Sequence, residues 1–110
     1  MKLIDLKPAF TNHVNDDEEY YDVPFSEANG IVFLCPECLR RKANGEKLHV
    51  HSVLCWNPSV PKTVSPKPCR WNMVGTGFND LSLINGSSSI ALHGGCDAHF
   101  WIKNGEVVFC

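Results

Sequence analysis

The sequence predicts a small, mainly β protein: a single domain built on an antiparallel sheet, with a β-hairpin at its C-terminal end. Three observations lead to this prediction. Short apolar runs recur along the chain, each only long enough for one strand. Glycine, proline and asparagine separate these runs. Finally, Asn104-Gly105 lies between two apolar segments, and this dipeptide is the strongest signal for a two-residue hairpin turn.

The length of the chain fits one domain. Its 110 residues can bury only a modest core, and proteins of this size are often stabilised further by a metal ion or by disulfides. We expect one metal-stabilised unit. Residues 1–28 form its N-terminal strand and an acidic linker, and residues 29–110 form its β-rich core.

The N-terminal part begins with a short strand over residues 1–6, which Pro8 ends. The stretch NDDEEYYDVP follows at residues 15–24, with five acidic residues between Asp16 and Asp22. We interpret this stretch as a solvated linker. The alternative is a docking segment for a basic partner.

Two strands are expected in the middle of the chain. Residues 30–34, GIVFL, are an apolar run of the buried-strand type that leads directly to Cys35-Pro-Glu-Cys38. One or two helical turns are expected in the following stretch LRRKANG, from residue 39 to near Gly45. Residues 48–56 alternate in polarity, as in a strand with two different faces. One face carries Leu48, Val50, Leu54 and Trp56, and the other carries His49, His51, Val53 and Cys55.

The second half of the chain is expected to contain a proline-rich loop and further strands. Residues 57–68 hold four of the seven prolines, which predicts an irregular, extended loop. Strands are expected at residues 70–74, 80–84 and 88–92, the last two around Asn85-Gly86.

The C-terminal hairpin has a predicted register. A two-residue turn at Asn104-Gly105 places Lys103 opposite Glu106, an opposite-charge pair. One face of the hairpin is then expected to lie in the core, and it carries Phe100, Ile102, Val107 and Phe109.

The six cysteines allow two interpretations. Three disulfides would fit a secreted scaffold. However, Asp5 and Lys7 interrupt what would be the apolar core of an export signal, and no run approaches the ~18 apolar residues of a membrane span. We therefore expect a cytoplasmic protein whose reduced cysteines bind metal or pack as small buried groups.

Two short motifs have the spacing of metal ligands. Cys35-x-x-Cys38 places two thiolates on one turn, which the intervening proline stiffens. Cys96-x-x-His99 has the same spacing at the start of the C-terminal hairpin. Together they form a Cys₃His set that suits tetrahedral zinc and predicts zinc-ribbon-like knuckles, because thiolates disfavour magnesium and calcium. Without a metal, the cysteines would be buried apolar groups and His99 a surface residue.

Three further residues are close enough in the predicted sheet to reach this site. His51 and Cys55 share one strand face, and Cys110 is expected opposite His99. His51 ranks first among them, as an alternative ligand or as a residue that supports the ligands. Cys55 and Cys110 are interpreted as packing residues, and the sequence leaves open whether they are free thiols.

The ligand set favours a structural role for the metal. A catalytic zinc keeps one open position beside a general base, and four protein ligands leave none. Glu37 and Asp97, the nearest acids, are expected to face outward. The main hypothesis is a non-enzymatic protein-interaction module, with contact points at Trp56 or Trp101. The other interpretation of both tryptophans is packing in the core. The alternative is a metal-dependent hydrolase with an open zinc position near His51.

Nucleic acid is not an expected partner. The formal net charge is −2, and the basic cluster at residues 40–42 is interpreted as solvated surface.

Several stretches resemble a family of small proteins from tailed phages and bacteria. The stretches are MKLIDLKPAF, GIVFLCPEC, HSVLCW, RW followed by GTG, DLSL, and GGCDAHFWIKNGEVVF. The resemblance covers nearly the whole chain, and CPEC and CDAHFWI are its most specific parts. This family is grouped as a numbered domain of unknown function, and some members carry the automated label "ammonia monooxygenase". Paired thiolates do not fit a copper or iron oxygenase.

The resemblance implies a ligand set and a setting. It favours the metal ligands Cys35, Cys38, Cys96 and His99, and it favours His51 over the other histidine of the same strand. Relatives occur as accessory genes in phage genomes, so the resemblance also implies a phage accessory protein, located in the host cytoplasm if the chain is phage-encoded, without fixing an activity. The chain departs from the family at residues 84–90, INGSSSI, where Pro-Ser-Ile is expected.

Overall fold

The computed structural model describes residues 1–15, 18–66, 69–84, 90–91 and 98–109. The protein is mainly β, as the sequence predicts. Its elements are η1 (Leu3–Leu6), β1 (Ala9–Asn15), β2 (Glu18–Tyr21), η2 (Phe25–Glu27), β3 (Gly30–Leu34), α1 (Pro36–Ala43), β4 (Ser52–Trp56), β5 (Asn72–Val74), β6 (Ser82–Ile84), β7 (Ile90–Ala91), β8 (His99–Lys103) and β9 (Glu106–Phe109).

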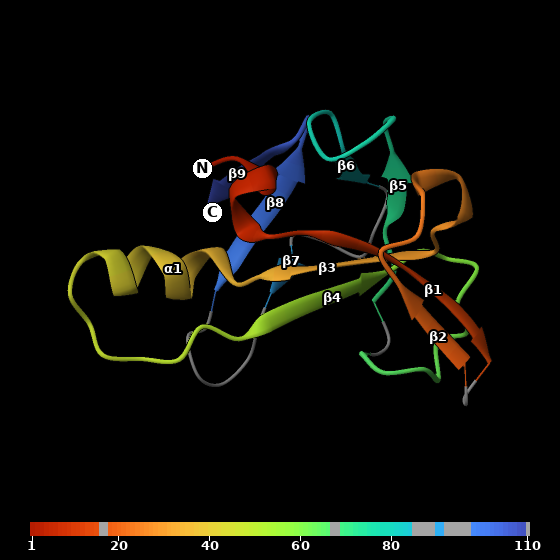
Figure 1. The fold of residues 1–110 in the computed structure, drawn as a ribbon, viewed down its shortest axis with the longest axis horizontal. Coiled ribbons are helices and arrows are strands. Elements are labelled where there is room, and N and C mark those ends of the chain that lie inside the picture. Colours follow the sequence, from red (N-terminus) through yellow and green to blue (C-terminus); the bar gives the residue numbers. More distant parts are fainter. Residues whose placement is uncertain (16–17, 67–68, 85–89, 92–97, 110) are drawn as a thin grey trace.

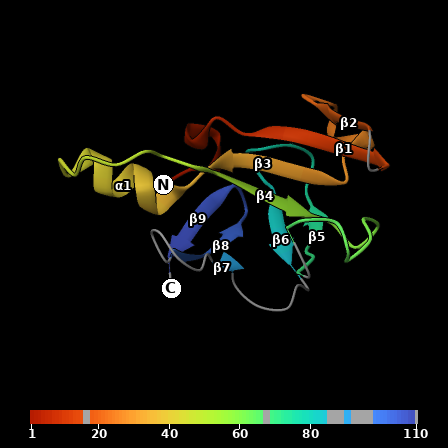
Figure 2. The ribbon, with the colours of Figure 1, turned by 90° about the horizontal axis from the view of Figure 1, so that it is seen from below.

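The strands form three antiparallel sheets (Figure 1). The four-stranded sheet has the order β2-β1-β3-β4, β5 pairs with β6, and the third sheet has the order β7-β8-β9. Figure 2 shows the four-stranded sheet on one side of the molecule and β7, β8 and β9 on the other. The core lies between these sheets, where Phe33 of β3 meets Phe100 of β8 edge to face with ring centroids 6.0 Å apart.

The N-terminal segment differs from its prediction. Residues 3–6 form a 3₁₀ helix, η1, where the sequence predicts a strand. Leu3 and Leu6 are both fully buried, and a spacing of three residues places side chains on one side of a 3₁₀ helix but on opposite faces of a strand. The backbone of η1 is tied to the C-terminal hairpin, because Leu3 N–H donates to Gly105 O over 2.9 Å.

The acidic stretch is not a linker throughout. Residues 18–21 form β2, which pairs with β1 in the register Thr11↔Tyr21 and Asn12↔Tyr20. All four side chains of β2 are exposed, so the stretch is polar on both faces. Such a strand is stabilised by backbone hydrogen bonds to its neighbour and not by buried side chains. Its amino-acid composition is therefore like that of a solvated linker.

The C-terminal hairpin confirms its predicted register. Phe100 pairs with Phe109 and Lys103 with Glu106 across the Asn104-Gly105 turn. Gly105 has φ +75°, the left-handed conformation that such a turn requires. One residue differs from the prediction: Phe109 is 38% exposed, and its ring lies 5.4 Å from the guanidinium carbon of Arg40 instead of in the core.

The strands expected around Asn85-Gly86 do not pair with each other. The first, β6, pairs with β5, and the second, β7, pairs with β8. The turn itself, and most of the segment that departs from the family pattern, lie outside the described residues.

The second strand of the central pair is shorter than predicted. It covers only residues 52–56, and it ends at Trp56, which is 1% exposed and therefore not a surface contact. The indole lies over Gly30, where a Cβ atom would collide with the ring and with Thr11 Oγ1. Trp101, the other proposed contact, is partly buried, and its ring centroid lies 5.2 Å from Lys103 Nζ.

The proline-rich loop after β4 is irregular, as predicted, but one buried side chain organises it. Arg70 is 5% exposed, and among the described residues its guanidinium donates hydrogen bonds to backbone carbonyls. The acceptors are the carbonyl oxygens of Val60, Pro61, Val64, Pro66 and Cys69, at 2.5–3.0 Å. Five donor N–H groups thus meet five acceptors, so the cation is fully hydrogen-bonded without a carboxylate.

Candidate metal site

The pairing of β3 with β4 positions the first two residues of the site. The ladder runs to Leu34↔Ser52, and one step further Cys35 N–H donates to His51 O over 2.8 Å. Residues that lie directly opposite each other in antiparallel strands project to the same face. Cys35 and His51 therefore continue the face that carries the buried pair Phe33 and Val53.

Helix α1 positions the third residue. Cys35 is its N-cap, Pro36 opens the helix with a preset φ, and Cys38 lies in the first turn. The helix therefore begins three residues earlier than predicted, inside the CPEC motif rather than after it.

These elements bring together Cys35, Cys38 and His51 as a group that can hold a metal ion. One ligand atom from each residue lies within 4.8 Å of the others. Sulfur atoms bound to one tetrahedral zinc at about 2.3 Å are about 3.8 Å apart, so the spacing fits such an ion. Cys35 and Cys38 are 0% and 4% exposed, whereas His51 is exposed, so the group opens to solvent on the imidazole side.

The backbone next to His51 orients its ring. His51 Nδ1 lies 3.2 Å from Ser52 O. In the tautomer that carries its proton on Nδ1, this N–H donates to the carbonyl and Nε2 keeps the lone pair that a metal requires. A carbonyl partner of this kind is the usual support of a metal-binding histidine.

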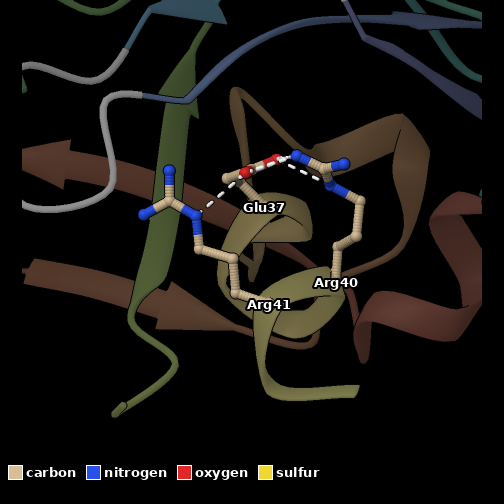
Figure 3. Close-up of polar contacts among 3 residues, drawn as sticks. All are labelled: Glu37, Arg40 and Arg41. Carbon is tan, nitrogen blue, oxygen red and sulfur yellow. Dashed lines mark hydrogen bonds and ion pairs between the residues drawn. The ribbon is translucent and has the colours of Figure 1, made fainter. Parts of the chain in front are cut away.

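Glu37, between the two cysteines, is held by two arginines (Figure 3). Its carboxylate accepts hydrogen bonds from Arg40 Nη2 at 2.6 Å and from Arg41 Nε at 3.0 Å. It is only 7% exposed, although the sequence predicts that it faces outward. The hydrogen bonds from Arg40 hold the pKa of this carboxyl below its usual value. Glu37 is therefore an ionised structural anion and a poor general base.

His99 does not join this group. It lies on β8 between the buried residues Ala98 and Phe100, and its own side chain is exposed. Since side chains alternate along a strand, His99 projects away from the core face on which Phe100 meets β3. Cys96, Asp97 and Cys110 lie outside the described residues. The set Cys35, Cys38, Cys96 and His99 therefore stays a prediction.

Cys55 shares the strand face of His51, as predicted, but it packs in the core. It is 2% exposed, and burial, with a further contribution from Cys69, raises the pKa of its thiol to about 12. A thiol with this pKa stays protonated at neutral pH, and a metal requires the thiolate. Both Cys55 and Cys69 are free cysteines.

The Cys55 thiol predicts a loss of stability at alkaline pH. In the unfolded chain it ionises near its ordinary pKa of 9.0, whereas the folded protein keeps the proton up to about pH 12. Between these values only the folded state binds this proton, so raising the pH favours unfolding by about 1.4 kcal/mol per pH unit. Urea unfolding at several pH values above 9 should show this slope as the difference between the wild type and Cys55→Ala. Parallel pH profiles of the two proteins would contradict it.

The sequence ranks His51 below His99 as a ligand. Among the described residues, the group that can hold a metal ion contains His51, and the set with His99 stays a prediction. A signal was present in the sequence. The apolar run before Cys35 and the alternating run after His51 are both strands, and pairing them as neighbours brings these two residues together.

Comparison of the chain with protein-family models, with curated proteins and with solved structures finds no match. The resemblance to the phage and bacterial family therefore stays a prediction. Within the described residues, no helix is both long and apolar enough to span a membrane.

Proposed function

We propose that this protein is a non-enzymatic protein-interaction module stabilised by one structural zinc ion, with Cys35, Cys38, His51 and Cys96 as ligands. The observation that carries the proposal is the convergence of two buried thiols and one imidazole at the junction of β3, α1 and β4. Such soft and borderline ligands select zinc over magnesium or calcium. A bound zinc would cross-link these three elements and add its binding free energy to folding.

The choice of Cys96 as the fourth ligand has two supports. It precedes Ala98 by two residues, and Ala98 is buried in the same core cluster as Cys35 and Cys38. A third thiolate also completes the Cys₃His type that is common in structural zinc sites. His99, the histidine of the same motif, is exposed on β8 and lies outside the group of Cys35, Cys38 and His51.

The proposed role is to present a binding surface rather than to catalyse a reaction. The one acid inside the CPEC motif is bound by two arginines, which leaves a metal-bound water without that base. We propose a protein as the partner, encountered in the cytoplasm, and in a phage-infected host if the family resemblance holds.

Native mass spectrometry and X-ray absorption at the zinc edge test the proposal. We expect one zinc per wild-type chain with three sulfur neighbours and one nitrogen neighbour. Cys96→Ala should lose a sulfur neighbour or the ion, whereas His99→Ala should keep both. A wild-type protein that folds without metal would overturn the proposal, as would a site that is unchanged in Cys96→Ala.

The same spectra decide the alternative function. Three protein ligands in the described group match the ligand count of a catalytic zinc, so a metal-dependent hydrolase is the second candidate. It requires two sulfur neighbours, one nitrogen and one water oxygen in the wild type. Three sulfur neighbours would exclude it.

A further inference from the structure

In the described part of the four-stranded sheet, the outer edge of β2 is open to a partner strand. β2 is an edge strand of the four-stranded sheet, and all of its side chains are exposed. The opposite edge strand, β4, is different. Its side chains Val53 and Cys55 are buried, and the carbonyl oxygen at its end, on Trp56, accepts a hydrogen bond from Trp71 N–H at 3.1 Å.

The register shows which backbone groups of β2 point outward. His13 of β1 uses its backbone N–H and C=O to bond the side chain of Asn29, on the β3 side. Because backbone groups of successive strand residues point to opposite sides, Asn12 faces β2 and pairs with Tyr20. Glu19 and Tyr21 then direct their N–H and C=O groups away from the sheet. No other strand pairs with this edge in the part of the chain that the structure describes.

The side chains along this edge suit a basic partner on both faces. Glu18 and Tyr20 share one face, with Tyr20 Oη donating to Glu18 Oε2 over 3.2 Å. Glu19 and Tyr21 share the other face, with Tyr21 Oη donating to Glu19 Oε2 over 3.3 Å. The two tyrosines are 52% and 55% exposed. Each face therefore offers one carboxylate and one aromatic ring, and both attract lysine or arginine.

We infer that the outer edge of β2 binds a basic, extended segment of a partner protein by strand addition. The inference deepens the proposed function, because it names the surface and the class of partner of the interaction module. Main-chain hydrogen bonds to Glu19 and Tyr21 supply affinity in this mode, and alternate lysine or arginine side chains supply specificity.

A second copy of the chain fits this edge poorly. β2 carries Glu18 and Glu19, and the sequence adds three more acids at positions 16, 17 and 22, so antiparallel pairing of two copies would bring like charges together. Charge complementarity therefore selects a basic strand over self-association.

The edge is remote from the metal site. The β1–β2 hairpin lies at one end of the molecule and α1 at the other (Figures 1 and 2). A change in β2 can therefore be tested without changing the ligands.

The test uses a capped eight-residue peptide of alternating lysine and threonine, titrated into ¹⁵N-labelled protein. We expect the largest amide shifts at Glu19 and Tyr21, and an affinity that falls as salt is added. Glu19→Lys should bind roughly fivefold more weakly, because it replaces an attraction by a repulsion. Asp5→Lys, with the same charge change on the exposed face of η1, should bind like the wild type at matched salt.

Two control peptides separate strand addition from charge attraction. A peptide with glutamate in place of lysine should not bind. A lysine peptide whose alternate backbone nitrogens are methylated keeps its charge but cannot pair with the edge. Equal binding of the methylated peptide would overturn the inference. Absence of any lysine-peptide binding would also overturn it, and would leave the acids only the role of protecting an edge strand from aggregation.

Metal content is measured on the same samples by native mass spectrometry. Peptide binding by a folded protein without zinc would overturn the proposed site alone. A zinc-loaded protein that does not bind the peptide would overturn the inference about the β2 edge alone.

Discussion

Replacing Cys35 by alanine is expected to release the metal and to unfold the protein at room temperature. Structural zinc ions contribute apparent binding free energies of about 10–16 kcal/mol, whereas domains of ordinary size are stable by only about 5–15 kcal/mol. Loss of one buried thiolate from the group of Cys35, Cys38 and His51 would therefore remove most of the stability. Native mass spectrometry should find no zinc, and circular dichroism should show no cooperative thermal transition.

Cys55→Ala is the matched control for this experiment. Both thiols are buried, at 0% and 2% exposure, and both substitutions remove the same atom. Cys55 lies outside the ligand group, so its loss should cost only about 1–2 kcal/mol, for a small cavity, and should leave one zinc bound. If Cys35→Ala keeps its metal and melts like Cys55→Ala, then Cys35 is a packing residue and the zinc proposal is wrong.

Replacing Arg70 by methionine should produce the second large effect, a loss of about 3–5 kcal/mol in the free energy of unfolding. Methionine has a similar length but no donor, so the five carbonyls around the guanidinium would lose their shared partner. The free energy of unfolding of Arg70→Lys should lie between those of the wild type and Arg70→Met. An ammonium offers three donors from one point and cannot span five acceptors. Urea unfolding followed by tryptophan fluorescence measures the effect, since Trp56 Nε1–H donates to Ser65 O in the same loop.

Lys62→Met is the control for the loop. Lys62 is exposed in the same proline-rich segment, so its substitution should change stability by less than about 0.5 kcal/mol. Zinc content should stay at one ion in every folded variant, which separates the effect from the metal site. A stability of Arg70→Met within about 1 kcal/mol of the wild type would show that water replaces the guanidinium.

Local signals predict much of this fold. The Asn104-Gly105 turn determines the hairpin register, because turn conformation and strand twist depend on adjacent residues. The CPEC motif likewise identifies both cysteines of the candidate site, since a short turn alone brings their sulfur atoms together.

The incorrect predictions concern elements whose structure depends on a pairing or packing partner. β2 forms because β1 provides a ladder, and its exposed side chains give no burial pattern. Residues 3–6 form a 3₁₀ helix because this places Leu3 and Leu6 on the same side, where both are buried in the core. The metal set with His99 stays a prediction, because Cys96 lies outside the described residues. His51 lies beside Cys35 because β3 pairs with β4, and the alternation of residues 48–56 alone does not specify that pairing.

The hydrogen bond between Leu3 and Gly105 has a consequence for biosynthesis. A ribosome makes η1 first and its hydrogen-bonding partner only after nearly the whole described chain has emerged. Contacts of such sequence separation form late and slow the folding of the domain. The β3–α1–β4 segment, in contrast, is closed by the nearby residues 35 and 51, so it can assemble while the rest is still being translated. Under the proposed function, a metal ion would then meet Cys35, Cys38 and His51 on a nascent chain, and the contact between η1 and the C-terminal hairpin would form last.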